Sequence, residues 1–226
     1  MACRAVVFTD LDGTLLDGET YSFEAARPAL KELKRRQVPV VLCTSKTRAE
    51  TVALARKLGL KHPFIVENGG AIFISQGYFS PEQLKSAGVK PKRKGNYVVL
   101  ELGLPYRRLR QFLISFRKKY KVKITGFGDC QPEEIARITG LSRRKARLAS
   151  QREYDEPCWL EGQTGVRLFR QKAREAGLKV VQGGRFFHLT GSNDKGRAVR
   201  LLKKLYCLKF GRIISLGLGD AANDWP

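Results

Sequence analysis

Histidine is scarce in this chain of 226 residues, which has only His62 and His188. So small a number argues against a histidine-based catalytic triad or a histidine-rich metal site. Cysteine is also sparse, with five residues that are scattered and form no Cys-x-x-Cys pair. An odd, dispersed set argues against a disulfide framework or a zinc site and favours the reducing cytoplasm.

Long apolar runs and acidic residues are also in short supply. The sequence has no apolar run of about 18 residues and no signal-peptide pattern, so we expect no membrane-spanning segment. Only 21 acidic residues oppose 43 basic ones, giving a net charge of +22. A surplus of 15 lies between Lys85 and Arg152, where 19 basic residues face 4 acidic ones. This favours phosphorylated metabolites or polyanions as partners, although a solvated surface is the plainer interpretation.

Strand and helix patterns alternate in the first part of the chain. Buried-strand patterns cover residues 5–8, 38–43 and 64–66, and helix patterns lie between them. Thr47 to Glu50 fits a capping box, and Gly59 closes the helix that follows. This β-α-β-α-β order predicts an α/β fold with a doubly wound parallel sheet.

Composition changes near residue 80 and returns near residue 191. Within this stretch we expect one β-α-β unit over residues 97–125 and a second over residues 158–181, followed by a hairpin to residue 189. We therefore predict core parts at residues 1–82 and 191–226, with a basic α/β domain inserted at residues 83–190. No helix pattern follows the strand at 213–216, so we also expect a C-terminal truncation.

Polar residues follow each expected core strand. Asp10 and Asp12 come after the first strand, and side chains two apart on a strand share one face. Two nearby carboxylates repel unless a cation or proton lies between them. Thr44 and Ser45 follow the second strand, and the remaining groups are the turn at residues 67–70, a lysine at a helix start (Lys195) and an acidic turn (Asp220, Asn223, Asp224). The edge of the sheet is therefore a candidate catalytic site.

Each piece has a simpler interpretation when taken alone. Asp10, Asp12 and Gly13 match an EF-hand loop, but its first position would be Phe8 and a strand precedes it. Thr44 and Ser45 could simply begin a helix, Lys195 could be solvated, and the acidic turn could be only a turn. Their co-occurrence at successive strand ends favours a shared site.

Taken in order, these motifs resemble the haloacid dehalogenase superfamily of phosphatases. The matching residues are Asp10-x-Asp12-Gly13-Thr14, Thr44, Lys195 and Gly219-Asp220-x-x-Asn223-Asp224, and the basic insert stands where a type-C2 cap would. The resemblance implies a Rossmann-like core. It also implies that Asp10 is the nucleophile, that Asp12 is the general acid and base, and that Thr44, Ser45 and Lys195 hold the phosphoryl group.

Mg²⁺ is the cofactor that this resemblance implies. Asp10, Asp12 through its backbone carbonyl, and Asp220 would be its ligands, and Asn223 and Asp224 would order the metal-bound waters and Lys195. Ala221 departs from the serine that most members carry after the metal aspartate, which could loosen these outer contacts.

Further stretches are similar to the mannosyl-3-phosphoglycerate phosphatase branch. They are residues 43–48, 63–70, 152–157, 183–188 and 194–198. This resemblance implies hydrolysis of a phosphorylated glycosyl-glycerate to a compatible solute. Arg185 would bind the carboxylate, and Asn68, Gly69 and Gly70 would line the phosphate side. Arg185 could instead be a surface residue and His188 a core histidine, while residues 152–156 could bind sugar hydroxyls or only join a helix to its strand.

Two other functions remain open from the sequence. One is a phosphatase for another sugar phosphate, such as glucosyl-3-phosphoglycerate or sucrose 6-phosphate. The other is a polyanion-binding protein on the same scaffold, although the basic stretch lacks a known RNA-reading motif. We expect a cytoplasmic protein with a small phosphorylated substrate and no membrane partner, and the oligomeric state stays open.

Overall fold

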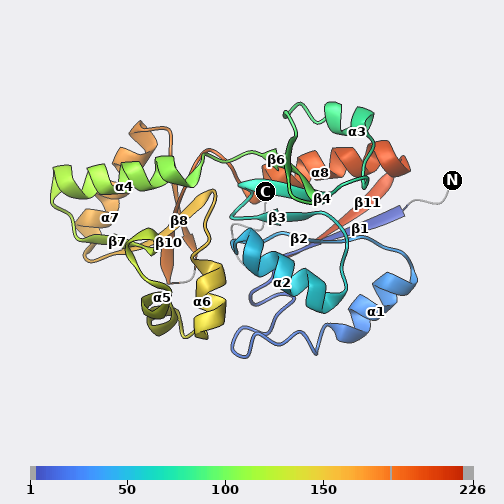
Figure 1. Ribbon diagram of the computed structural model, residues 1–226, viewed down its shortest axis with the longest axis horizontal. Coiled ribbons are helices and arrows are strands. Elements are labelled where there is room, and N and C mark those ends of the chain that lie inside the picture. Colours follow the sequence, from blue (N-terminus) through green and yellow to red (C-terminus); the bar gives the residue numbers. More distant parts are fainter. Residues whose placement is uncertain (1–3, 184, 221–226) are drawn as a thin grey trace.

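The computed structural model describes residues 4–183 and 185–220, which form two lobes joined side by side (Figure 1). The core lobe contains a mixed sheet flanked by helices, and the second lobe contains a separate antiparallel sheet. Mixed sheets and helices confirm the predicted α/β class.

The parallel part of the core sheet has the strand order β11-β1-β2. Parallel pairing joins β1 to both neighbours, and a parallel bridge from Cys43 to Ile65 continues the order to β3. The bounds are β1 (Arg4–Thr9), β2 (Val40–Leu42), β3 (Phe64–Val66) and β11 (Ile213–Leu218). The predicted parallel sheet is therefore present, and its strands end at one common edge.

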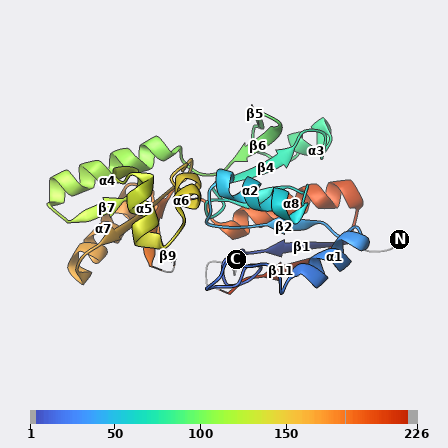
Figure 2. The ribbon, with the colours of Figure 1, turned by 60° about the horizontal axis from the view of Figure 1, so that its bottom comes forward.

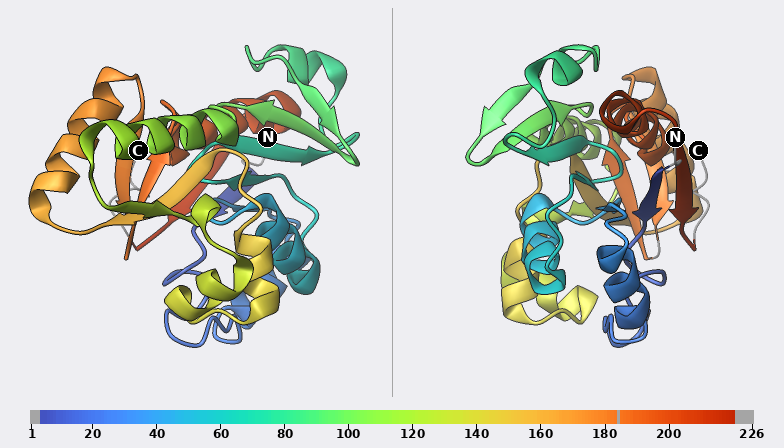
Figure 3. Two further views of the ribbon diagram at one scale, coloured as in Figure 1. Left: turned by 60° about the vertical axis from the view of Figure 1, so that its left-hand side comes forward. Right: turned by 90° about the vertical axis from the view of Figure 1, so that its right-hand side faces the viewer.

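Helices cover both faces of this sheet, as a doubly wound fold requires. Alternate residues along β2 and β3 point to opposite faces and enter two separate apolar clusters, and β1 adds Val6 and Phe8 to one of them. One cluster includes α8, and the other includes α1 and α2 (Figure 3). The helices are α1 (Arg27–Arg35), α2 (Arg48–Leu58) and α8 (Lys195–Phe210). The expected capping box at Thr47 and the left-handed Gly59 at the end of α2 are both confirmed.

An antiparallel extension completes the core sheet in the order β3-β4-β6-β5. It contains β4 (Ala71–Ser75), β5 (Lys92–Lys94) and β6 (Tyr97–Glu101), with α3 (Pro81–Lys85) between β4 and β5. Because β6 pairs with β4, the β-α-β unit predicted over residues 97–125 is wrong. The apolar side chains of β6 complete the core clusters, which is the physical reason for this pairing. The domain division stays a prediction, and this pairing favours a boundary after Glu101.

The inserted lobe has a four-stranded antiparallel sheet in the order β7-β8-β10-β9. Helices α4 and α7 pack on one face of it, and α5 and α6 pack on the other, toward the core (Figure 2). The bounds are α4 (Tyr106–Tyr120), β7 (Ile124–Gly126), the 3₁₀ turn η1 (Phe127–Asp129), α5 (Pro132–Thr139), α6 (Arg143–Ala149), β8 (Asp155–Leu160), α7 (Gln163–Glu175), β9 (Lys179–Gly183) and β10 (Phe186–Thr190). The predicted second unit, β8-α7-β9, is present with β10 inserted between its strands, and the predicted hairpin joins β9 to β10.

The chain crosses between the lobes at two adjacent places. A Cβ atom added to Gly103 would lie 3.0 Å from the Asn193 Oδ1 atom and 3.1 Å from the Gly70 Cα atom. A Cβ atom on Gly191 would lie 3.1 Å from Leu104. The segment that enters the inserted lobe and the segment that returns from it therefore pack closely, because glycine at residues 103 and 191 leaves no side chain between them.

No helix among the described residues is long and apolar enough to cross a membrane.

Candidate active site

A cavity of about 450 Å³ lies between the two lobes and is bordered by residues from both. Its core wall is formed by the ends of β1 and β11, the loop after β2 and the start of α8. The wall on the side of the inserted lobe is formed by α5, α6 and the β9-β10 hairpin. The predicted site residues on its wall are Asp10, Asp12, Ser45, Asn68, Arg185, Lys195 and Asp220. Residues as far apart as 10 and 220 thus share one space.

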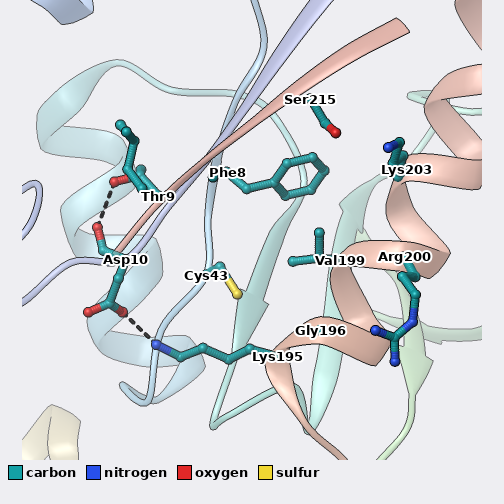
Figure 4. Close-up of a pocket in the computed structure, with 12 residues that line it drawn as sticks. Phe8, Thr9, Asp10, Cys43, Lys195, Gly196, Val199, Arg200, Lys203 and Ser215 are labelled. Carbon is teal, nitrogen blue, oxygen red and sulfur yellow. Dashed lines mark hydrogen bonds and ion pairs between the residues drawn. The ribbon is translucent and has the colours of Figure 1, made fainter. Parts of the chain in front are cut away.

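Asp10 and Lys195 form the ion pair at the centre of the core wall. The Lys195 Nζ atom donates to Asp10 Oδ1 across 2.8 Å, and both side chains are nearly buried. Asp10 stands at the tip of β1, where its own N–H donates to the carbonyl of Leu218 at the end of β11. Figure 4 shows Lys195 reaching from the first turn of α8 toward the Asp10 carboxylate. The pair places a nucleophilic carboxylate beside a fixed positive charge.

Asp12 is held by a lysine that the sequence did not single out. The Lys46 Nζ atom donates to Asp12 Oδ2 across 2.7 Å. Among the described residues, the Asp12 Oδ1 atom is buried and has no hydrogen-bond partner. A buried carboxylate oxygen without a partner is costly unless a ligand or solvent meets it, so this atom marks a contact that the cavity can supply.

Asp220 lies directly against the loop that carries Asp12. A Cβ atom on Gly13, whose φ is +73°, would lie 2.4 Å from Asp220 Oδ2, so only glycine fits between them. The Thr14 hydroxyl donates to Asp220 Oδ1 across 3.3 Å. Asn223 and Asp224, predicted to stand behind this group, lie outside the described residues, as does Ala221.

Thr44 and Ser45 lie at the end of β2, in the loop that leads into α2. Thr44 is almost fully buried and does not border the cavity, and its Oγ1 atom accepts from the N–H of Lys46 at 3.1 Å. Ser45 does border the cavity. The inserted lobe contacts this loop twice, since Arg152 donates to the Ser45 carbonyl at 2.9 Å and the Thr47 hydroxyl donates to the Leu148 carbonyl at 2.9 Å.

The turn after β3 has an unusual backbone. Glu67, Asn68 and Gly69 have φ values of 49°, 55° and 81°, and such a run of left-handed residues is strained outside glycine. Asn68 borders the cavity, as expected. Gly69 and Gly70 pack instead against neighbouring chain segments, because their Cβ atoms would lie 2.1 Å from the Asp194 carbonyl oxygen and 2.4 Å from Tyr154.

Glu67 anchors the inserted lobe to this turn. Its carboxylate is completely buried and accepts from the backbone N–H groups of Glu153 and Tyr154 at 2.8–3.1 Å. Burial raises the pKa of Glu67 to about 8, although the nearby Arg152 guanidinium opposes this rise. In the sequence, Glu67 is part of the turn at residues 67–70, and no local pattern indicates its role.

Arg185 and Arg152 bring positive charge to the inserted side of the cavity. Arg185 is exposed and donates to the Thr139 carbonyl across 3.0 Å. Arg152 lies over the Phe127 ring, with its guanidinium carbon 5.6 Å from the ring centre. Of the two interpretations of residues 152–156, the joining role is present: Arg152 donates to the Ala149 carbonyl at the end of α6, and β8 begins at Asp155. The same stretch also joins the inserted lobe to the core.

Comparison with known proteins places these features in a family. Residues 7–94 match the haloacid dehalogenase-like hydrolase family. The chain is 48% identical over 224 residues to a glucosyl-3-phosphoglycerate/mannosyl-3-phosphoglycerate phosphatase of Methanococcoides burtonii, a match that covers 99% of this chain and 80% of the relative. It is 37% identical over 221 residues to a mannosyl-3-phosphoglycerate phosphatase of Pyrococcus horikoshii, which covers 98% of this chain and 85% of the relative.

A solved structure supports the fold. A phosphatase of the haloalkanoate dehalogenase superfamily from Bacteroides thetaiotaomicron matches with a TM-score of 0.65 at 16% identity, covering 99% of this chain and 80% of that one. The chain therefore belongs to the haloacid dehalogenase superfamily of phosphatases, alongside the phosphatases of glycosyl-3-phosphoglycerates.

Proposed function

We propose that this chain hydrolyses mannosyl-3-phosphoglycerate to mannosylglycerate, a compatible solute, in the cytoplasm. The observation that carries this proposal is the pairing of Asp10 with Lys195 at the centre of a cavity walled by both lobes. The names of the relatives support the substrate, and the free thiols of Cys130, Cys158 and Cys207 agree with a reducing compartment. Glucosyl-3-phosphoglycerate is the second candidate, because it stands in the name of the Methanococcoides relative.

The residues at the strand ends fit a divalent cation. Asp10, Asp220 and the backbone carbonyl of Asp12 are hard oxygen donors of the kind that Mg²⁺ prefers, and Asp220 already packs against the Asp12 loop. Among residues 4–183 and 185–220, no three His, Cys, Asp or Glu side chains form a metal-binding group. We therefore assign the ion to these two carboxylates and this carbonyl, with solvent and phosphate as the other ligands. When bound, Mg²⁺ would neutralise the charge that otherwise makes the carboxylate and the phosphate repel each other.

Hydrolysis then follows from the positions of two carboxylates. Asp10 attacks phosphorus in line and forms an aspartyl-phosphate, while the leaving alkoxide takes a proton from Asp12. Asp12 next removes a proton from water, which attacks the phosphorus and regenerates Asp10. Lys195 stays within hydrogen-bond distance of Asp10 and offsets the negative charge of the phosphoryl group. Ser45, on the cavity wall, would offer its backbone N–H to a phosphoryl oxygen.

Asp10→Asn is the direct test of this mechanism. We expect phosphate release from mannosyl-3-phosphoglycerate to fall by about 10⁴-fold or more, because the amide cannot form the covalent intermediate. Chelation by EDTA should also stop release, and added Mg²⁺ should restore it. Asp17→Asn is the matched control, since Asp17 is exposed and only bonds its own turn. Unchanged release by Asp10→Asn would refute the covalent mechanism.

A further inference from the structure

A buried carboxylate, Asp155, lies between the two lobes just behind the wall of the cavity. Asp155 is completely buried at the start of β8. From the core, the Asn68 Nδ2 atom donates to its Oδ2 atom across 2.7 Å. From β10 in the inserted lobe, His188 Nδ1 lies 2.9 Å from both carboxylate oxygens. Both of these partners border the cavity, whereas Asp155 does not.

The contacts of Asp155 determine which nitrogen of His188 carries a proton. Burial alone would raise the pKa of Asp155, but His188, Arg152 and Asn68 together hold it below its usual value. An ionised carboxylate can only accept hydrogen bonds, so the Nδ1 atom of His188 must be the donor. The ring is thereby fixed in one orientation and tautomer, in the manner of other carboxylate–histidine pairs.

The opposite edge of the imidazole ring meets Gly183. A Cβ atom on Gly183 would lie 3.1 Å from His188 Cδ2 and 3.2 Å from His188 Nε2, so a larger residue would crowd this edge. Gly183 and His188 both border the cavity. The absence of a side chain at residue 183 therefore leaves the Nε2 edge of His188 approachable from the cavity side.

We propose that His188 contacts the sugar of the substrate through Nε2, and that Asp155 is a positioning residue that holds His188 and Asn68 in place. This inference rests on the proposed function, which supplies a substrate with a sugar. With Nδ1 donating to Asp155, the Nε2 atom is left for the substrate, and a hydroxyl group suits it because a hydroxyl can both donate and accept a hydrogen bond. The buried negative charge of Asp155 disfavours a carboxylate or phosphate at the same place. Lys195 and Lys46, which lie on the core wall of the cavity beside Asp10 and Asp12, are the cations available for the anionic end of the substrate.

Substrates with and without the sugar test the proposal. Mannosyl-3-phosphoglycerate supplies KM and kcat, and 3-phosphoglycerate, which keeps the phosphate and carboxylate but lacks the sugar, supplies an inhibition constant. We expect His188→Gln to raise KM for the mannosylated substrate about tenfold, which is the size expected for one lost hydrogen bond. The effect on kcat should be much smaller. The inhibition constant of 3-phosphoglycerate should change less than about twofold, which also shows that the site is folded.

Asp155→Asn checks the positioning role, because it keeps the shape of the side chain but loses its charge. We expect its KM to rise in the same direction and 3-phosphoglycerate inhibition to persist. His62→Gln is the matched control, since His62 lies outside the cavity and bonds Tyr78.

Three outcomes would overturn the proposal. An unchanged KM in His188→Gln would show that His188 does not contact the sugar. Equal losses of affinity for mannosyl-3-phosphoglycerate and for 3-phosphoglycerate would show a general defect of the site. A KM unchanged by Asp155→Asn would remove its positioning role. Failure of the wild-type protein to release phosphate from either glycosylated compound would instead refute the proposed function itself.

Discussion

At the scale of single residues, the candidate site is built from side chains that lie far apart in the sequence. Asp10, Asp12 and Asp220 could be expected at one edge because parallel strands end together. Two contacts could not be expected: that of Asp12 with Lys46 spans 34 residues, and that of Asn68 with Asp155 spans 87 residues and depends on how the lobes meet. Gly69 was expected to line the phosphate side, but its neighbour, the Asp194 carbonyl, is known only from the fold.

Two glycines allow crowding to be separated from backbone strain. Gly69 and Gly77 have φ values of 81° and 78°, but only Gly69 has atoms within 4 Å of an added Cβ atom. We expect Gly77→Ala to lower the free energy of unfolding by about 1–2 kcal/mol, from the left-handed backbone alone. Gly69→Ala should cost at least about 2 kcal/mol more, because it must displace the backbone at Asp194. Urea unfolding of both variants measures the difference, and equal losses would contradict the crowding.

At the scale of elements, helices were predicted well and strand neighbours less well. The capping box at Thr47 and the closing Gly59 are local signals, and both mark the bounds of α2. The partner of β6 is a tertiary choice, because its apolar side chains fit the core sheet as well as they would fit a new one. Sequence patterns alone therefore gave this strand the wrong neighbours.

The turn after β3 should make stability depend on pH through Glu67. Its pKa is about 8 in the folded protein, against 4.5 for the ordinary side chain, so between these values the folded state holds a proton that the unfolded state has lost. The free energy of unfolding must then fall as pH rises through this window, by at most about 5 kcal/mol in total. Below pH 4.5 the contribution is fully present.

Glu67→Gln should remove this slope, because the amide stays neutral and its oxygen can still accept from the backbone N–H groups of Glu153 and Tyr154. Denaturant unfolding at a series of pH values compares the variant with the wild type. Glu175→Gln is the matched control, because Glu175 is exposed at the end of α7. Glu50→Gln would not serve as a control, because Glu50 caps α2. If Glu67→Gln kept the full slope, the raised pKa would belong to another group.

At the scale of the whole molecule, the net charge of +22 bears on how substrate arrives. A positive protein attracts anions before contact, and salt screens that attraction. The insert carries much of this charge and forms one wall of the cavity. The composition of the chain predicts the sign of the field, but the position of Arg152 and Arg185 on the cavity wall depends on the fold.

We expect kcat/KM for mannosyl-3-phosphoglycerate to fall as ionic strength rises. A simple aryl phosphate, which lacks the carboxylate, should show a shallower fall because it carries less charge. Initial rates at low substrate, measured between about 0.02 and 0.5 M salt, provide both slopes. Equal slopes for the two substrates would show that the carboxylate takes no part in the attraction.

The adjacent crossings at Gly103 and Gly191 have a mechanical consequence. A lobe that is joined to the rest of the molecule only at two touching segments can rotate about them. Other contacts also join the lobes: the Thr47 hydroxyl donates to the Leu148 carbonyl at α6, and Glu67 accepts from the backbone N–H groups of Glu153 and Tyr154 beside the Gly103 crossing. These contacts resist rotation of the inserted lobe relative to the core.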